Sequence, residues 1–343
     1  MSLPSEPPST SDSTSSTSTS STAASASSDN STESKWKQLQ QDTKLKPILE
    51  YRGIWYVPRF NTEEGRNSNH FYHMQADFGV EATYEQAPGF YSKILWGYTP
   101  SADMFGTDNI NRFLAREYYI GKKSERYVFQ LGLQQKSFGL ENWDHTSLQK
   151  TLLEFGTNPY SYGLMVADKK LLDDISSLKN VLLQWMYFDS NPFEDKSFQY
   201  KGFIANMIYS EWLGLSLLSE ENEFNKKKAA AIFTKMNLSK VLDINFEHGT
   251  VWNSTNVLGD SSSSYSFLKF IYHSTLEYAF IIERQNMGFS EATPNQWRWI
   301  LEGEYSYNNH LSLTTQLINK SEYLSGKTFG NDWTFQEILH LQF

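Results

Sequence analysis

Residues 168–186 read DKKLLDDISSLKNVLLQWM, and this stretch decides which fold the sequence predicts. Its apolar residues recur at the spacing of one helix face, about 3.6 residues per turn. They are Leu171, Leu172, Ile175, Leu178, Leu182, Trp185 and Met186. Lysine and aspartate side chains fall on the opposite face. The pattern therefore predicts an amphipathic α-helix over the whole stretch.

Further helices are expected in the second half of the chain. After a break at Asn191-Pro192-Phe193, residues 198–218 are mostly apolar and predict a long helix. Residues 267–282 are apolar nearly all round, which is typical of a central buried helix. Weaker helical patterns cover residues 219–236, 293–301, 310–317 and 334–341.

The first half of the chain mixes both patterns. Residues 48–84 are rich in β-formers with interspersed Gly and Pro, and residues 125–134 alternate, so both stretches predict strands. Capping residues favour helices over residues 108–121 and 146–156. The fold class expected from the whole chain is mainly α with a minor β component (α+β).

The chain divides into an arm and a body. Residues 1–34 contain 21 Ser or Thr, four acidic residues, no basic residue and no aromatic residue. Such a composition cannot bury enough apolar surface to fold, so we expect a disordered arm over residues 1–35. Residues 36–343 are expected to form a single large, mainly helical domain. Within it, the Ser-rich residues 240–264 suggest a projecting segment.

Composition excludes several classes of protein. The chain has 343 residues and no Cys, which rules out disulfides, thiolate metal sites and a Cys nucleophile. A net charge of −9 argues against a protein that mainly neutralises nucleic-acid phosphates. Neither a secretory signal nor a stretch of about 18 uninterrupted apolar residues is present. We therefore expect no contact with a membrane and no secretion.

Catalytic motifs are equally scarce. Gly326-Lys327-Thr328 resembles the end of a phosphate-binding loop, but Ser321 stands where that loop needs a glycine. His70 and His73 form the closest histidine pair, yet on a strand their rings would point to opposite faces. The sequence predicts no catalytic, cofactor-binding or metal-binding residues, and a protein that is not an enzyme.

The sequence is rich in aromatic residues, with 23 Phe, 20 Tyr and 10 Trp. One protein core absorbs so many rings with difficulty, and Tyr and Trp are enriched where protein surfaces meet. We therefore expect contacts between identical subunits, with a monomer that has a large aromatic core as the alternative. The candidate contact residues are Trp55, Tyr56, Trp96, Tyr98, Trp252, Trp297 and Trp333.

This layout resembles the coat proteins of the partitivirus or plant cryptic virus group. The resemblance is carried by the Ser/Thr arm before Trp36, the aromatic block YRGIWYVP at residues 51–58, the segment ILWGYTPS at residues 94–101, and the helical second half. It implies a helical shell domain with a protruding part. It also implies homodimers that assemble into an icosahedral shell around a double-stranded RNA genome and a polymerase.

Three hypotheses follow for the function. The first is a self-assembling viral coat protein located in virions and the host cytoplasm, with copies of itself as partners and RNA and polymerase on its inner face. The second is a cytosolic enzyme or bacterial effector whose site combines scattered residues such as His70, His73 and Asp77. The third is a binding module whose Ser/Thr-rich tail is controlled by phosphorylation.

Overall fold

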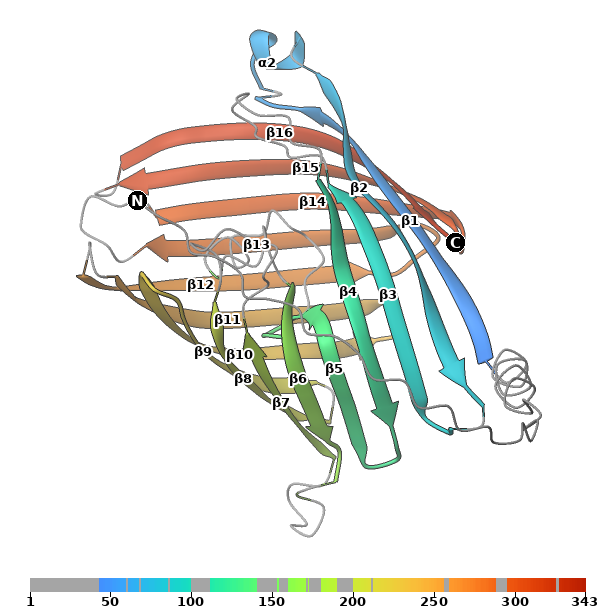
Figure 1. Ribbon diagram of the computed structural model, residues 1–343. Coiled ribbons are helices and arrows are strands. Elements are labelled where there is room, and N and C mark those ends of the chain that lie inside the picture. The colour runs from blue at the N-terminus through green and yellow to red at the C-terminus, as the bar shows by residue number, and fades with distance from the viewer. Residues whose placement is uncertain are drawn as a thin grey trace, which may run out of the picture. The chain divides into compact units, whose positions relative to one another are not determined.

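The computed structural model describes residues 43–59, 61–67, 69–85, 87–99, 112–140, 153, 160–170, 172, 180–189, 200–210, 212–255, 259–287, 295–324 and 327–343. In these residues, sixteen antiparallel strands form one closed barrel (Figure 1). The strands are β1 (Thr43–Val57), β2 (His70–Tyr84), β3 (Phe90–Thr99), β4 (Arg112–Lys123), β5 (Tyr127–Gln135), β6 (Tyr160–Asp168), β7 (Val181–Asp189), β8 (Lys201–Tyr209), β9 (Leu213–Glu221), β10 (Asn225–Ser239), β11 (Leu242–Thr255), β12 (Gly259–Tyr272), β13 (Glu277–Met287), β14 (Asn295–Asn308), β15 (Leu311–Leu324) and β16 (Lys327–Gln342). The short helix α2 (Glu63–Asn67) lies between β1 and β2.

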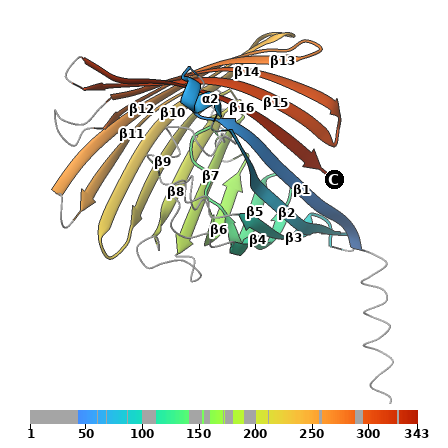
Figure 2. The ribbon, with the colours of Figure 1, turned by 90° about the horizontal axis from the view of Figure 1, so that it is seen from above.

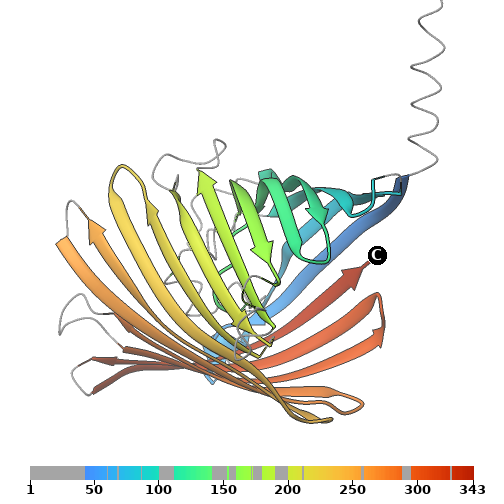
Figure 3. The ribbon, with the colours of Figure 1, turned by 90° about the horizontal axis from the view of Figure 1, so that it is seen from below.

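The topology is the simplest that closes a barrel. Each strand pairs with the strands before and after it in the sequence, and β1 pairs with β16 to complete the ring. The closing ladder runs from the pair Glu50–Gln342 to the pair Val57–Phe335. Figures 2 and 3 show the strands following one another around the wall. A closed ladder leaves no sheet edge with unpaired backbone groups.

The two ends of the barrel differ in their connections. At one end, which we call the turn end, residues 240–241 and 309–310 connect neighbouring strands directly. At the opposite end, which we call the loop end, longer segments such as residues 58–69 and 136–159 connect the strands. β1 begins and β16 ends at the turn end, as the even number of strands requires.

The faces of the wall have opposite character, as β9 illustrates. Leu215 and Leu217 point outward and are 38% and 48% exposed, whereas Ser216 and Glu220 between and beyond them are buried. Alternate residues of a strand face opposite sides of a sheet. β9 therefore exposes leucine side chains on the outside and buries Ser216 and Glu220 on the inside, the reverse of a water-soluble protein.

The same reversal extends around the barrel. Large aliphatic and sulfur-containing side chains are exposed along the middle of the outer face: Ile120, Leu131, Leu164, Met207, Leu215, Leu217, Ile232 and Leu301. Exposed aromatic side chains lie toward the turn end, at Tyr127, Trp212, Tyr272, Tyr278 and Tyr305, and toward the loop end, at Trp55, Phe71, Tyr187, Phe203 and Trp252. An apolar band thus lies between two sets of aromatic residues.

The predicted fold class, mainly α with a minor β component, is wrong. The stretch expected to be an amphipathic helix, residues 168–186, contains the last residue of β6 and most of β7. Along β7 the outward Tyr187 and the inward Met186 and Phe188 are all apolar or aromatic. Because most side chains on both faces of this strand are apolar, it lacks the alternation by which a strand is recognised.

The other predicted helices fail for related reasons. Residues 198–218 include β8 and the start of β9, and residues 267–282 include the end of β12, a turn at residues 273–276 and the start of β13. Four more expected helices lie in strands: residues 112–121 of the 108–121 prediction in β4, 219–236 mainly in β10, 310–317 in β15 and 334–341 in β16. Of residues 293–301, residues 295–301 lie in β14. The stretches predicted to be extended, 48–84 and 125–134, do contain β1, β2 and β5.

The predicted division into arm and domain can be compared with the structure only over the described residues. The arm expected at residues 1–35 and most of the helix expected at residues 146–156 lie outside the described residues. Thr43–Phe343 form one compact unit. Residues 240–264, expected to project, contribute to β11 and β12. In the described part of the chain, no helix has the length and apolar character required to cross a membrane.

The β12–β13 turn carries an exposed charge cluster. The His273 Nε2 lies 2.9 Å from Asp243 Oδ2, and its Nδ1 lies 2.9 Å from Glu277 Oε2. The hydrogen bond with Asp243 and the negative charge of Glu277 together raise the pKa of His273 above its ordinary value of 6.5. The stabilisation from this cluster is complete below pH 6.5 and is lost as the pH rises through the raised pKa.

We predict that Asp243→Asn lowers the pKa of His273, because the variant removes the hydrogen-bonding carboxylate and its charge. The measurement is an NMR pH titration of the His273 ring in the refolded barrel. The control is Asp260→Asn at the opposite end of β12, which should leave the His273 titration unchanged. An unchanged His273 titration in the variant would contradict the assignment.

A second prediction tests closure of the barrel. Ile54 and Ile338 face each other across the β1–β16 seam in the more closely spaced type of antiparallel pair, since the flanking pairs follow the hydrogen-bonded register of Leu49 and Phe343. Ile54→Cys combined with Ile338→Cys should form a disulfide on oxidation, detected by gel mobility and mass spectrometry. The chain contains no other thiol. Pairing Ile54→Cys with Thr334→Cys, which is out of register, should give no cross-link, and equal cross-linking of the two would contradict the seam.

Candidate functional site

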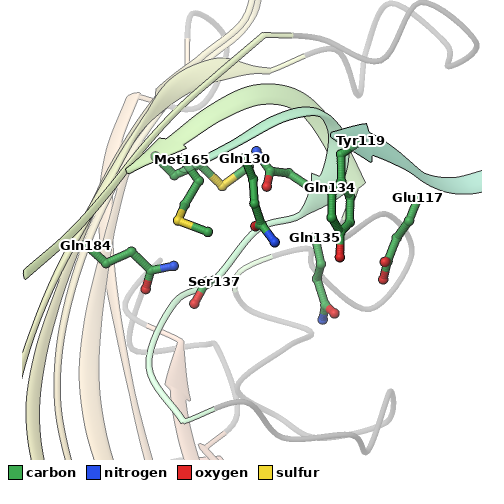
Figure 4. Close-up of a pocket in the computed structure, with 9 residues that line it drawn as sticks. Glu117, Tyr119, Gln130, Gln134, Gln135, Ser137, Met165 and Gln184 are labelled. Carbon is green, nitrogen blue, oxygen red and sulfur yellow. The ribbon is translucent and has the colours of Figure 1, made fainter. Parts of the chain in front are cut away.

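The segment that follows β5 enters the barrel. β5 ends at Gln135, and residues 136–140 run along the inner wall instead of over its rim (Figure 4). Their contacts are with inward-facing side chains of β8 to β12, far from β5 in the strand order. We call residues 136–140 the inner segment.

A buried charge cluster anchors the start of the inner segment. Lys136 Nζ lies 3.2 Å from Glu220 Oε2, and Lys227 Nζ lies 3.1 Å from Glu220 Oε1. All three side chains are at least nine-tenths buried. The two ammonium groups also lie over aromatic rings, that of Lys136 at 4.7 Å from Phe188 and that of Lys227 at 4.8 Å from Tyr200. Glu220 thus joins the inner segment to the wall at β9 and β10.

A second carboxylate holds the end of the inner segment. Glu247 of β11 is fully buried, and its two oxygens accept hydrogen bonds from the Leu140 backbone N–H and the Tyr265 hydroxyl, both at 2.6 Å. Gly139 packs directly against the same carboxylate with a φ of 66°. A Cβ at position 139 would lie 2.2 Å from Glu247 Oε1, so only glycine fits here without displacement.

Two further hydrogen bonds fix the middle of the inner segment. Asn206 Nδ2 donates to the Ser137 carbonyl at 3.0 Å, and the Gly139 N–H donates to Ser216 Oγ at 2.9 Å. Together with Glu247 of β11, these polar side chains of β8 and β9 therefore pair the backbone of the segment in place of water.

Apolar contacts complete the docking. Phe138 and Leu153 pack into a buried cluster that extends from Met165 on β6 to Tyr265 on β12. Leu140 packs into a second cluster with inward residues of β10 and β12 to β15. Only the concave inner face brings side chains of so many strands together. This part of the lumen is therefore filled by protein.

The remaining inner wall is lined with ion pairs. Around β1 and β16, Glu50 Oε1 lies 2.6 Å from Arg52 and 3.2 Å from His340. Nearby, Asp77 Oδ1 of β2 lies 3.1 Å from Arg116 Nε of β4. These side chains are inward-facing, and those of Glu50, Arg52 and His340 keep partial solvent exposure.

The charges continue on both sides of this region. Lys93 lies 2.7 Å from Glu117, and Lys269 lies 3.0 Å from Glu302. Glu302 also accepts a hydrogen bond from Gln316, which in turn accepts one from the Gln336 amide. Charges of both signs are thus paired along the open part of the wall.

A hollow of about 230 Å³ lies between the inner faces of β4 to β7 and the inner segment. Figure 4 shows its lining, which comes from β4 to β7 and from the inner segment. The lining residues are Glu117, Tyr119, Gln130, Gln134, Gln135, Ser137, Met165, Gln184 and Met186. Amide groups dominate its polar surface.

The seven aromatic residues proposed as subunit contacts do not form one site. Trp55, Trp96 and Trp252 are exposed on the outer face. The register places Tyr98, Trp297 and Trp333 on that face too, partly covered by neighbours, and places Tyr56 inside beside Gln336. Trp297 stacks with Trp299. Whether any of these seven residues contacts another copy of the chain stays a prediction.

The scattered residues of the enzyme hypothesis are not brought together. His73 faces outward and pairs with the Tyr51 hydroxyl at 2.6 Å, whereas Asp77 faces inward beside Arg116. His70 is exposed at the loop end. Among the described residues, no group of three or more potential ligand side chains is arranged to hold a metal ion.

The residues that anchor the inner segment were missed by sequence reasoning. The helix expected over residues 219–236 would place Glu220, Glu221 and Lys226 to Lys228 on a solvated surface. In the structure, Glu220 and Lys227 face inward as a register pair, whereas Glu221 and Lys226 are exposed. The available signal in the sequence was the pair Glu220-Glu221 on one side of the short connection at residues 222–224 and the pair Lys226-Lys227 on the other. Such opposite charges can pair across a hairpin.

The comparisons with known proteins agree with this geometry. No protein-family model and no curated protein sequence matches the chain. Among solved structures, it is similar to the trimer form of OmpT, an outer membrane protein of Vibrio cholerae (TM-score 0.62, 9% identity, 88% of this chain and 99% of that chain covered). It is also similar to an anion-selective porin from Comamonas acidovorans (0.59, 9%, 88% and 100%) and to the outer membrane channel DcaP of Acinetobacter baumannii (0.56, 10%, 89% and 98%). At such low identity the similarity shows a shared fold.

These findings correct the viral interpretation. The chain has the barrel fold of outer membrane proteins, so the resemblance to partitivirus coat proteins is wrong. The same correction applies to the double-stranded RNA capsid, the shell of homodimers, the RNA and polymerase partners, the location in virions or cytoplasm, and the absence of membrane contact. The enzyme or effector and the phosphorylated binding module gain no support. The exposed rings are better explained by the outer face of a barrel than by subunit contacts in a shell.

We predict that Glu220→Gln destabilises the barrel by about 3–5 kcal/mol, because two buried ammonium groups lose their shared carboxylate. The measurement is equilibrium urea unfolding of the refolded protein in detergent. The matched control is Glu221→Gln on the same strand, whose exposed ion pairs with Lys201 and Lys226 contribute about 0–1 kcal/mol. Equal effects of the two substitutions would contradict the buried cluster.

Proposed function

We propose that this protein is a membrane-embedded channel through which small hydrophilic solutes diffuse, narrowed by the inner segment. The observation that carries the proposal is the combination of an apolar outer face with a polar, partly solvated inner wall in one closed barrel. An apolar outer face is unfavourable in water and favourable in the hydrocarbon interior of a bilayer, and a closed barrel leaves no unpaired backbone groups in that interior.

The outer face supports a location in a membrane. Its aliphatic band lies between two sets of aromatic residues, the distribution found in transmembrane barrels, where aromatic rings occupy the two lipid–water interfaces. Every strand also satisfies its backbone hydrogen bonds with two neighbours, as the hydrocarbon interior demands.

The inner wall supports a passage for hydrophilic solutes. Sixteen strands enclose a lumen wider than side chains alone can fill, and barrels of this size typically contain water. The inner segment occupies the side near β8 to β12, while the ion-paired side near β1, β2 and β14 to β16 retains partly exposed polar groups. Solutes would therefore pass along the ion-paired side.

The similar structures suggest which membrane is involved. Their names describe outer membrane proteins, an outer membrane channel and a porin. Most connections at the turn end are short and several at the loop end are longer, which also matches barrels of bacterial outer membranes, whose short turns face the periplasm. We therefore assign the protein to a bacterial outer membrane, with the turn end toward the periplasm.

The test is electrical recording of the refolded full chain in planar lipid bilayers. The proposal predicts discrete current steps of uniform size in potassium chloride. Insertion of the barrel, established by protection of its strands from protease in liposomes, without any current would contradict it.

We further predict that Gly139→Ala increases the single-channel conductance. The added Cβ collides with Glu247 and strains a left-handed backbone, so the inner segment loses its docked position and the lumen widens. The matched control is Gly259→Ala. Gly259 has a similar φ of 74°, but a Cβ there meets nothing within 4 Å. Equal conductance in the two variants would show that the inner segment does not limit the current.

A further inference from the structure

The amide-lined hollow beside the inner segment has the features of a binding site. Its volume of about 230 Å³ lies below the range of roughly 300–1,000 Å³ that accommodates drug-sized ligands. It lies in the lumen, and the inner segment contributes Ser137 to its lining. A solute diffusing past the inner segment would therefore meet this hollow.

The wall holds three of the glutamines by one half of each amide. Gln130 Nε2 donates to the Tyr91 hydroxyl at 2.9 Å, and Gln134 Nε2 donates to the Gly163 carbonyl at 3.1 Å. Gln184 Oε1 accepts from Asn206 Nδ2 at 3.1 Å. These bonds fix the orientation of each amide. They leave two carbonyl oxygens and one NH₂ group for a ligand.

The lining also contains apolar and aromatic side chains. Met165 and Met186 are both buried and contribute thioether side chains to the lining, and in Figure 4 Met165 lies on the side opposite the Tyr119 ring. Thioethers and aromatic rings pack well against C–H groups. The lining thus combines apolar side chains with hydrogen-bonding groups.

The hollow favours an uncharged ligand. Glu117 is the one charged side chain in its lining, and its carboxylate is neutralised by Lys93 at 2.7 Å. A charged ligand would have to give up water without gaining a free partner of opposite charge. Amide groups, by contrast, donate hydrogen bonds to and accept them from neutral ligand groups, so no charge has to be buried.

From these features we propose that the hollow is a binding subsite for a neutral, polyhydroxylated ring of monosaccharide size. The C–H groups of such a ring pack on the methionines, and its hydroxyls donate to the Gln130 and Gln134 carbonyls and accept from the Gln184 amide. The proposal rests on the channel function and specifies a solute class for it.

The test uses glucose as the probe. Glucose added to single channels should interrupt the current in a saturable way, and isothermal titration of the barrel in detergent should give a dissociation constant in the same range. Gluconate, which is charged, and acetamide, which has a single polar group, should bind more weakly. Tighter binding of either than of glucose would overturn the assigned ligand class.

Two variants assign the binding to the hollow. Gln184→Leu and Gln130→Leu each remove an amide and keep much of its volume, so each should weaken glucose binding by about fivefold to tenfold. The matched control is Gln296→Leu on β14, whose inward glutamine bonds to Glu322 on another part of the wall and should leave glucose binding unchanged. Gel mobility of unheated samples verifies that each variant folds. Two variants are used so that a folding defect in one leaves the other to decide.

The outcomes separate this proposal from the channel function. A conducting wild-type channel that shows no glucose block and no calorimetric binding would overturn the subsite alone. Equal glucose affinity in all three variants would also overturn it. If the inserted barrel carries no current, the channel proposal fails, and calorimetry on the detergent-solubilised variants still decides whether the hollow binds glucose.

Discussion

Closure of the backbone ladder is the constraint on which the rest of the structure depends. In a bilayer, every N–H and C=O group must find a partner within the protein, and the β1–β16 pairing provides partners for the last two edges. Once the sheet is closed, each strand has one face toward the surroundings and one toward the lumen. The outer face is therefore apolar along its middle, and the polar side chains are directed inward.

The interior shows a second feature: a lumen enclosed by sixteen strands is too wide for the side chains of the wall alone to fill. The inner segment fills one side with Phe138, Leu140 and their neighbours, and its polar backbone is paired by Asn206, Ser216 and Glu247. The other side stays polar, with charges paired within the wall. In the proposed channel, the inner segment sets the width of the passage, and it forms part of the lining of the amide-lined hollow.

Little of this fold could be predicted from the sequence. The strands β1, β2 and β5 could be predicted because β-branched and aromatic residues are frequent there. The expected helices, by contrast, were wrong. Most side chains on both faces of β7 and β8 are apolar, because the outer face is apolar and the inner segment packs on the inner face; this obscures the period of two. The anchoring residues Glu220, Lys227 and Glu247 gave no motif, because their partners lie on other strands and only folding brings them together.

The most direct test is a spin-label accessibility scan along β10 in liposomes. Single cysteines at residues 229–234 are introduced into a chain that otherwise has none. The structure predicts alternation: labels at 230, 232 and 234 should be relaxed by oxygen dissolved in the lipid, whereas labels at 229, 231 and 233 should be shielded from it. Accessibility that lacks this two-residue period, or that shows exposure to water-soluble reagents on the outward positions, would contradict a membrane-embedded barrel.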